Sequence, residues 1–206
     1  MDAALYDQWY DSPRGQWIGR REAELVLDHL QPRPGESMLD VGCGTGFFTR
    51  TLAASVDGPV HGIDISSDRV EYARQRNMEG ASYAVADARA LPYSDASFDL
   101  VMSITALCFI ENERQAISEI MRIGRRRFAI GLLNRHSLLW LKKGRGGGHG
   151  AYQGAHWHTL HEAKRLFQDQ AVRNLQVYTA IQLPGGGGLA RAIEHVWPAR
   201  FPFGAF

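Results

Sequence analysis

The chain has few cysteines and almost no net charge, and both shortages exclude classes of protein. Its 206 residues include two cysteines, Cys43 and Cys108, too few for a disulfide framework. A reducing, cytoplasmic compartment is therefore expected. Lys and Arg number 23 and Asp and Glu number 22, which leaves a net charge of +1. This balance supplies no field that would attract nucleic acid or an anionic membrane surface.

Long apolar runs are also missing. No stretch approaches the roughly 18 apolar residues that can span a bilayer. Acidic Asp2 and Asp7 stand where a secretory signal would carry cations and an apolar core, so no such signal is expected. The apolar fraction of 45% and the charged fraction of 22% are ordinary for a globular protein. A chain of this length is expected to form a single domain over residues 1–206.

Short apolar segments alternate with segments of helical periodicity through the middle of the chain. Apolar strands of this kind are typical of a parallel sheet covered on both faces, and their alternation with helices predicts a doubly wound α/β sheet. The predicted strands are residues 38–41, 60–64, 82–86, 98–104 and 128–133. The helices between them are predicted at 47–54, at 66–76 and after an N-cap at Asn112.

The two ends of the chain differ from this middle region. Residues 1–36 are rich in aromatics and have helical periodicity at 22–30, which predicts a helical cap. The glycine-rich basic stretch 142–150 is expected to be a mobile loop. Beyond it we expect a helix at 159–167 with a capping box, a sixth strand at 172–183 and a helical patch near 189–197.

Residues 39–47 carry the strongest functional signal, with the sequence Leu-Asp-Val-Gly-Cys-Gly-Thr-Gly-Phe. Glycine tolerates positive φ and lets the backbone approach a ligand closely. A dinucleotide-binding loop follows G-x-G-x-x-G, which would need glycine where this chain has Phe47. The carboxylate of Asp40 would repel a pyrophosphate but attract a cation. The pattern therefore favours S-adenosylmethionine, an adenosine cofactor with a cationic centre and no phosphate.

Two further aspartates end the next two strands. Asp64 lies 18 residues after Gly46 and can accept hydrogen bonds from both hydroxyls of a ribose. Asp87 can accept one from the exocyclic amine of adenine, while Ala88 offers its backbone N–H to the ring. Ligands of open α/β sheets bind at the carboxyl ends of strands. Three acids at three such ends are therefore interpreted as a cofactor site rather than as ordinary loop caps.

Four stretches resemble, in order, the motifs of class I S-adenosylmethionine-dependent methyltransferases: Leu39–Phe47, Gly62–Ser66, Asp87 with Leu91–Tyr93, and Ser97–Val101. They are most similar to the small-molecule branch that includes ubiquinone and menaquinone C-methyltransferases. The resemblance implies a Rossmann-like, mostly parallel seven-stranded sheet of order 3-2-1-4-5-7-6. The N-terminal helical cap (1–36) would precede a cofactor-binding half (37–135) and a substrate-side half (136–206). Either Phe203–Phe206 is the stub of the seventh strand, or that strand is truncated here.

The resemblance also implies a site and a reaction. A substrate nucleophile would displace the methyl group in line, which needs alignment but no covalent intermediate, so no catalytic residue is predicted. The acceptor would be a small molecule, and stretch 144–150 and the cap are candidate lids. The residues predicted to bind S-adenosylmethionine are Asp40, Gly42, Cys43, Gly44, Thr45, Gly46, Asp64, Ile65, Asp87, Ala88, Thr105 and Tyr6.

Three histidines have the spacing of a metal site, His156, His158 and His161. No cysteine accompanies them, and the helix cap uses Glu162, so they are interpreted as surface or pocket residues and no metal is predicted. One of them, or His136, is a candidate general base.

Other groups have two interpretations each. Arg122 and Arg125–Arg127 are interpreted as cations at a helix end rather than as a nucleic-acid patch. Tyr6 and Tyr10 either pack in the core or close over the cofactor. The pair Asn134 and Arg135 either contacts substrate or forms a turn.

Two other functions compete with methyl transfer. A protein of the same fold could bind S-adenosylmethionine without catalysis, or activate a partner. The alternative of a nicotinamide oxidoreductase is disfavoured by Phe47. The oligomeric state stays open.

Overall fold

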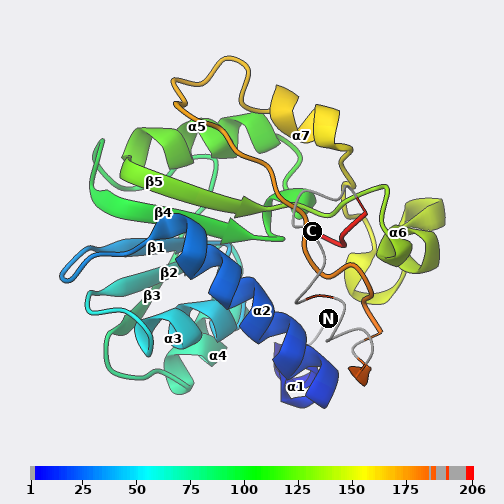
Figure 1. Cartoon of the computed structure of the whole chain (residues 1–206). Helices are drawn as coiled ribbons and strands as arrows, with labels where there is room; N and C mark the ends of the chain where they lie inside the picture. The colour runs from blue at the N-terminus through cyan, green and yellow to red at the C-terminus, as the bar shows by residue number, and fades with distance from the viewer. Residues whose placement is uncertain (1–2, 186, 189–193, 195–202) are drawn as a thin grey trace.

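A parallel sheet lies between two helical layers in the computed structural model, which describes residues 3–185, 187–188, 194 and 203–206 (Figure 1). Its strands are β1 (Met38–Val41), β2 (Val60–Asp64), β3 (Ala81–Val85), β4 (Phe98–Ile104) and β5 (Gly124–Gly131). The helices are α1 (Ala3–Asp11), α2 (Pro13–Leu30), α3 (Phe47–Ala53), α4 (Ser67–Gln75), α5 (Glu113–Ile123), α6 (Leu138–Lys143) and α7 (Leu160–Arg165). Short 3₁₀ turns are η1 (Leu107–Phe109), η2 (Arg145–Gly147) and η3 (Gly150–Tyr152).

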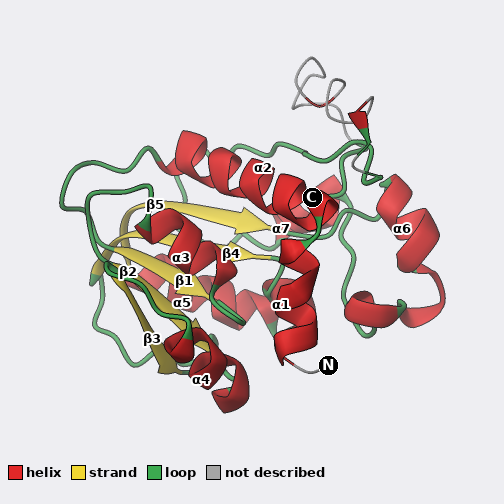
Figure 2. Ribbon diagram, turned by 90° about the horizontal axis from the view of Figure 1, so that it is seen from below, coloured by secondary structure: helices red, strands yellow, loops and turns green. Residues whose placement is uncertain are grey.

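The strand order is β3-β2-β1-β4-β5, and every pairing is parallel. This is the predicted order for the first five strands. Central β1 is buried along all four residues, with Met38 opposite Val60 on one side and Leu100 on the other. The carboxyl ends of all five strands therefore meet at one edge of the sheet, and α1 lies beyond that edge (Figure 2).

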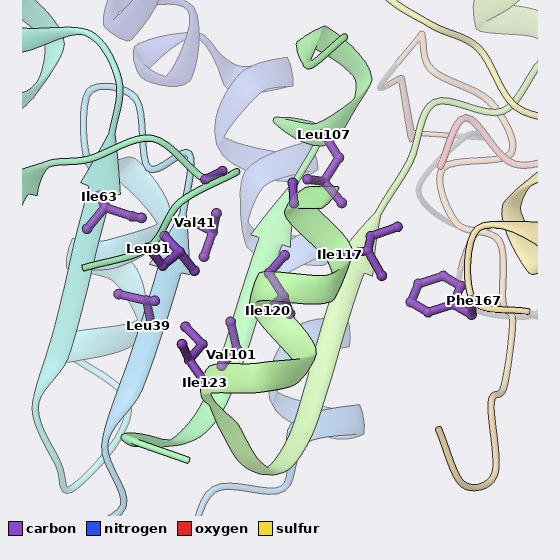
Figure 3. Packing of buried hydrophobic residues seen from close by; sticks show 12 residues of the cluster. Leu39, Val41, Ile63, Leu91, Val101, Leu107, Ile117, Ile120, Ile123 and Phe167 are labelled. Carbon is purple, nitrogen blue, oxygen red and sulfur yellow. The ribbon is translucent and has the colours of Figure 1, made fainter. Parts of the chain in front are cut away.

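Helix α5 covers one face of the sheet because its apolar residues recur at helical spacing. Ile117, Ile120 and Ile123 are fully buried and pack against Leu39 and Val101 of the sheet (Figure 3). The opposite face is covered by α2 and α3 (Figure 1). Helix α2 begins at a Ser12 cap followed by Pro13, which suits a first helical turn.

Most of the predicted elements agree with the structure, but the predicted start of the fifth strand is wrong. Strand β5 begins at Gly124 rather than at residue 128, because α5 ends at Ile123 and the chain enters the strand directly. The stretch 142–150 is partly helical rather than wholly a loop, and its mobility stays a prediction. It ends α6 and continues through two 3₁₀ turns, with positive φ at Gly146 and Gly148.

The predicted sixth strand at 172–183 is also wrong, because these residues form no strand. Backbone hydrogen bonds nevertheless join this segment to the C-terminal residues. Ala180 and Phe206 exchange two, at 2.9 and 3.3 Å, and the Ala205 N–H donates to the Ile181 carbonyl at 3.1 Å. The Asn134 N–H donates to the Ala205 carbonyl at 3.0 Å. The C-terminal residues thus lie between the end of β5 and residue 180. The described residues form five strands rather than seven, so the order 5-7-6 beyond β5 stays a prediction.

The helical patch predicted near 189–197 lies almost wholly outside the described residues. Within the described part of the chain, no helix has the length and apolar character needed to cross a bilayer.

Candidate cofactor-binding site

The glycine loop between β1 and α3 has a backbone that other residues rarely adopt. Gly42, Gly44 and Gly46 have φ of 80°, 54° and 82°. A Cβ on Gly42 would lie 2.2 Å from the Cβ of Ala106, so this glycine permits a close approach of two loops. A Cβ on Gly44 would meet nothing within 4 Å. Gly44 therefore borders open space in which a ligand can contact the backbone.

Asp64 ends β2 beside that open space. Its Oδ2 accepts the Gly44 N–H at 2.9 Å, and its Oδ1 accepts the Ser66 N–H at 2.9 Å. The residue is only 7% exposed. Each carboxylate oxygen carries two lone pairs, so Asp64 keeps acceptor capacity for the hydroxyls of a ribose. The next residue, Ile65, is an apolar side chain that is 66% exposed, and it can cover one face of a flat ring.

Asp40 lies buried at the end of β1. Its Oδ2 accepts the hydroxyl of Thr49 on α3 at 2.7 Å, and burial raises its pKa to about 7. The observed contact is therefore with α3, and the expected role toward the cationic end of the cofactor stays a prediction.

Asp87, after β3, is already engaged by a neighbour. Its two oxygens accept hydrogen bonds from the Arg89 side chain, the shortest at 2.8 Å, and Oδ1 also accepts the Arg89 N–H. The side-chain bonds from Arg89 lower the pKa of Asp87. An adenine amine would have to share this carboxylate with Arg89. Ala88 is buried in the core, so a contact with adenine would come from its backbone.

The side chains of Cys43 and Thr45 point away from the open space. Cys43 packs with Val70 and Tyr83, and burial raises the pKa of its thiol. The Thr45 hydroxyl donates to Asp7 at 2.7 Å. These two predicted site residues can offer backbone atoms to a ligand.

Asp7 on α1 is a site residue that sequence reasoning missed. It is 4% exposed and accepts hydrogen bonds from Thr45, from Arg76 at 2.8 Å and from the Tyr72 hydroxyl at 3.3 Å. It thereby joins α1 to the glycine loop and to the end of α4. Its partners lie 38 to 69 residues away in the sequence, so no local pattern could have revealed them.

The aromatic residues of the cap separate into two roles. Tyr10 stacks on Phe47 with ring centroids 3.8 Å apart, so it belongs to the core. Burial raises the pKa of Tyr6, and the carboxylates of Glu22 and Asp64 act in the same direction. Tyr6 therefore lies close enough to Asp64 to feel its charge. Thr105, which follows β4, donates its N–H to the Gly131 carbonyl at 2.9 Å and has φ of 55°.

The remaining candidates are occupied by partners within the chain. His156 and His158 lie 2.9 and 2.8 Å from the two oxygens of Glu113, while His161 is exposed. Over the described residues, no group of three or more His, Cys, Asp or Glu is placed to hold a metal ion. The Asn134 amide donates to the Gly204 carbonyl at 2.8 Å, and its Oδ1 accepts the His136 N–H at 3.0 Å, so the side chain serves the turn after β5 and its contact with the C-terminal residues.

Of the four arginines expected at a helix end, Arg122 lies on α5, whereas Arg125–Arg127 lie in β5, which begins directly after the helix. Arg127 donates to the His29 carbonyl and the Gln31 side chain. The other three pair with carboxylates. Their pairs are Arg122 with Asp95 and Glu119, Arg125 with Asp99, and Arg126 with Glu36.

A pocket of about 810 Å³ lies beside β5, between α2 and residues 173–180. Its lining includes Ile104 at the end of β4 and Leu132 and Leu133 after β5. It does not include the glycine loop, but Ile104 stands two residues before the Ala106 that packs on Gly42. The pocket thus lies next to the strand ends that the cofactor site uses.

Comparisons with known proteins match this geometry. The family described as "Methyltransferase domain" matches residues 39–127. An O-methyltransferase of Penicillium expansum is 40% identical over 111 residues, which cover 52% of this chain and 40% of that protein. An uncharacterised protein of Mycobacterium tuberculosis is 31% identical over 195 residues, or 90% of this chain and 63% of that protein. The chain thus spans less than two thirds of the length of these relatives.

A solved S-adenosylmethionine-dependent methyltransferase of Thermotoga maritima has the same fold. The TM-score is 0.69 at 23% identity, over 88% of this chain and 83% of that one. None of these findings tests the similarity to quinone C-methyltransferases, which stays a prediction. The matched domain and the relatives place residues 39–127 of this chain in the methyltransferase-domain family, and the chain has the fold of an S-adenosylmethionine-dependent methyltransferase.

Proposed function

We propose that this protein binds S-adenosylmethionine along Gly42–Gly46 and Asp64 and transfers its methyl group to a small molecule. One observation carries the proposal: open space beside Gly44 is bordered by the buried carboxylate of Asp64. The bound cofactor supplies an electrophilic methyl group on a cationic sulfur. The loop backbone and Asp64 fit its methionine and ribose parts, and exposed Ile65 fits the face of its adenine.

The contribution of the chain is alignment and exclusion of water. Helix α1, held to the loop by Asp7 and Thr45, covers the carboxyl-end edge of the sheet. Such a cover keeps the reacting groups close and dry, which favours a displacement in which charge disappears. The pocket beside β5 offers room for the acceptor. The small-molecule class is supported by the O-methyltransferase relative.

The alternative of a binding protein without catalysis has less support. Asp40, Asp64 and Asp87 are all present at their strand ends. We also propose a cytoplasmic location and no nucleic-acid partner. The two free cysteines support the first point, and the carboxylate-paired arginines support the second.

Calorimetric titration with S-adenosylmethionine and S-adenosylhomocysteine tests the cofactor site. Asp64→Asn keeps the shape of the side chain but removes its charge, and a hydrogen bond to a charged group contributes about 1.5–3 kcal/mol. We therefore expect binding to weaken roughly 10- to 100-fold. Asp68→Asn, at an exposed residue in the first turn of α4, is the matched control. Absence of binding by the unmodified protein would refute the proposal, and a labelled-methyl screen over cell metabolites would then find no acceptor.

A further inference from the structure

Glu22 is an acidic residue on the apolar face of α2. It lies four residues after Ile18 and three before Leu25, so all three share one side of the helix. Ile18 and Leu25 pack in the cluster that contains Leu133, which follows β5. Glu22 is 8% exposed in the same setting. A carboxylate is seldom buried without a partner, so this position calls for a physical reason.

No group in the described part of the chain compensates this carboxylate at its Oε1. That atom is buried and has no hydrogen-bond partner among the described residues. Burial raises the pKa of Glu22 to about 8. Glu22 interacts electrostatically with Tyr6, Tyr10 and Tyr152, whose own pKa values burial raises. Around neutral pH these phenols stay uncharged.

Glu22 lies between the pocket and the candidate cofactor site. It lines the 810 Å³ pocket together with apolar Leu25, Ile104 and Leu132. Toward the cofactor side, Tyr6 lies within electrostatic reach of both Glu22 and Asp64. An acceptor in this pocket would therefore place one end near the strand termini where the methyl group is expected.

We propose that Glu22 recognises the methyl acceptor, an apolar small molecule that presents an N–H or O–H group to this carboxylate. This inference rests on the proposed function. The lone pair of the acceptor nitrogen or oxygen forms the bond to the methyl carbon. The carbon–sulfur bond breaks and its electron pair stays on sulfur. The proton of the acceptor passes to the ionised form of Glu22, which predominates above pH 8, so atoms and charge balance.

Two variants isolate this role. Glu22→Gln keeps the volume of the side chain but cannot take a proton or carry charge. Glu24→Gln is the matched control, because Glu24 lies on the same helix with a side chain that is 58% exposed. The probes are 2-phenylethylamine, 2-phenylethanol and ethylbenzene, which share an apolar ring and differ in the polar group. Their dissociation constants are measured at pH 9, where Glu22 is mostly ionised, by ligand-detected NMR with S-adenosylhomocysteine present.

We expect at least one of the two polar probes to bind the unmodified protein and Glu24→Gln roughly tenfold more tightly than Glu22→Gln. Ethylbenzene should bind all three proteins alike. The inference is overturned if Glu22→Gln retains the affinity for both polar probes. It is equally overturned if neither polar probe binds the unmodified protein more tightly than ethylbenzene does.

A parallel titration with S-adenosylhomocysteine separates this inference from the proposed function. Glu22→Gln should bind that compound within about twofold of the unmodified protein, since Glu22 is not part of the cofactor loop. If the unmodified protein does not bind it, the proposed function fails. In that case the probe titrations are repeated without S-adenosylhomocysteine. The same comparison of the three proteins then tests whether Glu22 recognises the polar probes.

Discussion

Replacement of Glu22 by Gln should make the stability of the protein less dependent on pH. The folded state raises the pKa of Glu22 from 4.5 to about 8 because the side chain is buried. The folded protein therefore holds this proton more tightly than the unfolded chain does. Its stabilising effect is complete below pH 4.5 and is lost as the pH rises toward 8. A pKa difference of this size changes the free energy of unfolding by at most roughly 5 kcal/mol.

Glu22→Gln removes this titration. The free energy of unfolding of the variant should therefore rise steadily relative to that of the unmodified protein from pH 5 to pH 8. Asp40, whose pKa burial raises to about 7, is present in both proteins and cancels in the comparison. Urea unfolding followed by tryptophan fluorescence at several pH values measures this difference. For Glu24→Gln, the difference in unfolding free energy from the unmodified protein should stay constant over this pH range. Parallel stability profiles for Glu22→Gln and the unmodified protein would refute the assignment of Glu22 as a buried, uncompensated acid.

Three further outcomes are expected. Gly42→Ala should destabilise the protein by about 1–3 kcal/mol, because its Cβ would meet that of Ala106 at 2.2 Å, and Ala106→Gly should restore part of this in urea unfolding. Asp7→Asn should lose about 2 kcal/mol and expose the N-terminal helices to trypsin, whereas Asp11→Asn at an exposed position should not. At pH 7 Asp40 is about half protonated, so a cofactor cation that binds beside it should release a fraction of a proton. Calorimetry in phosphate and in Tris buffer detects this proton release, and Asp40→Asn should abolish it.

The centre of the sheet was predictable because burial on both faces leaves a simple pattern. The bounds of β1, β2 and β4 agree with the predicted strands, since these strands are mostly apolar and largely buried. The beginning of β5 was not predictable in this way. Arg125 and Arg127 look like solvent-facing residues, but their side chains reach Asp99 and the carbonyl of His29, which accommodates them in a strand. Such contacts depend on the completed fold.

The same distinction separates the site residues. The place of Asp64 was predictable because it ends β2, and its hydrogen bond from the Ser66 N–H belongs to the local turn that follows. Asp87 shows the limit of that reasoning, because the local turn also brings Arg89 onto the carboxylate. Asp7 depends on partners far away in the sequence, so a sequence pattern carries no trace of it.

Glu22 belongs to neither group. Its place on the apolar face of α2 is visible in the sequence, but such a placement has a common alternative explanation. A charge at an apolar helix position usually reaches solvent along its flexible stem. Here α2 packs on the cluster around Leu133, and the carboxylate stays inside. A buried acid whose Oε1 has no partner among the described residues lowers the stability of the fold, and selection for folding alone would replace it. Destabilised polar groups of this kind are concentrated at functional sites. The physical cost of Glu22 is therefore the reason to look for its partner in a ligand.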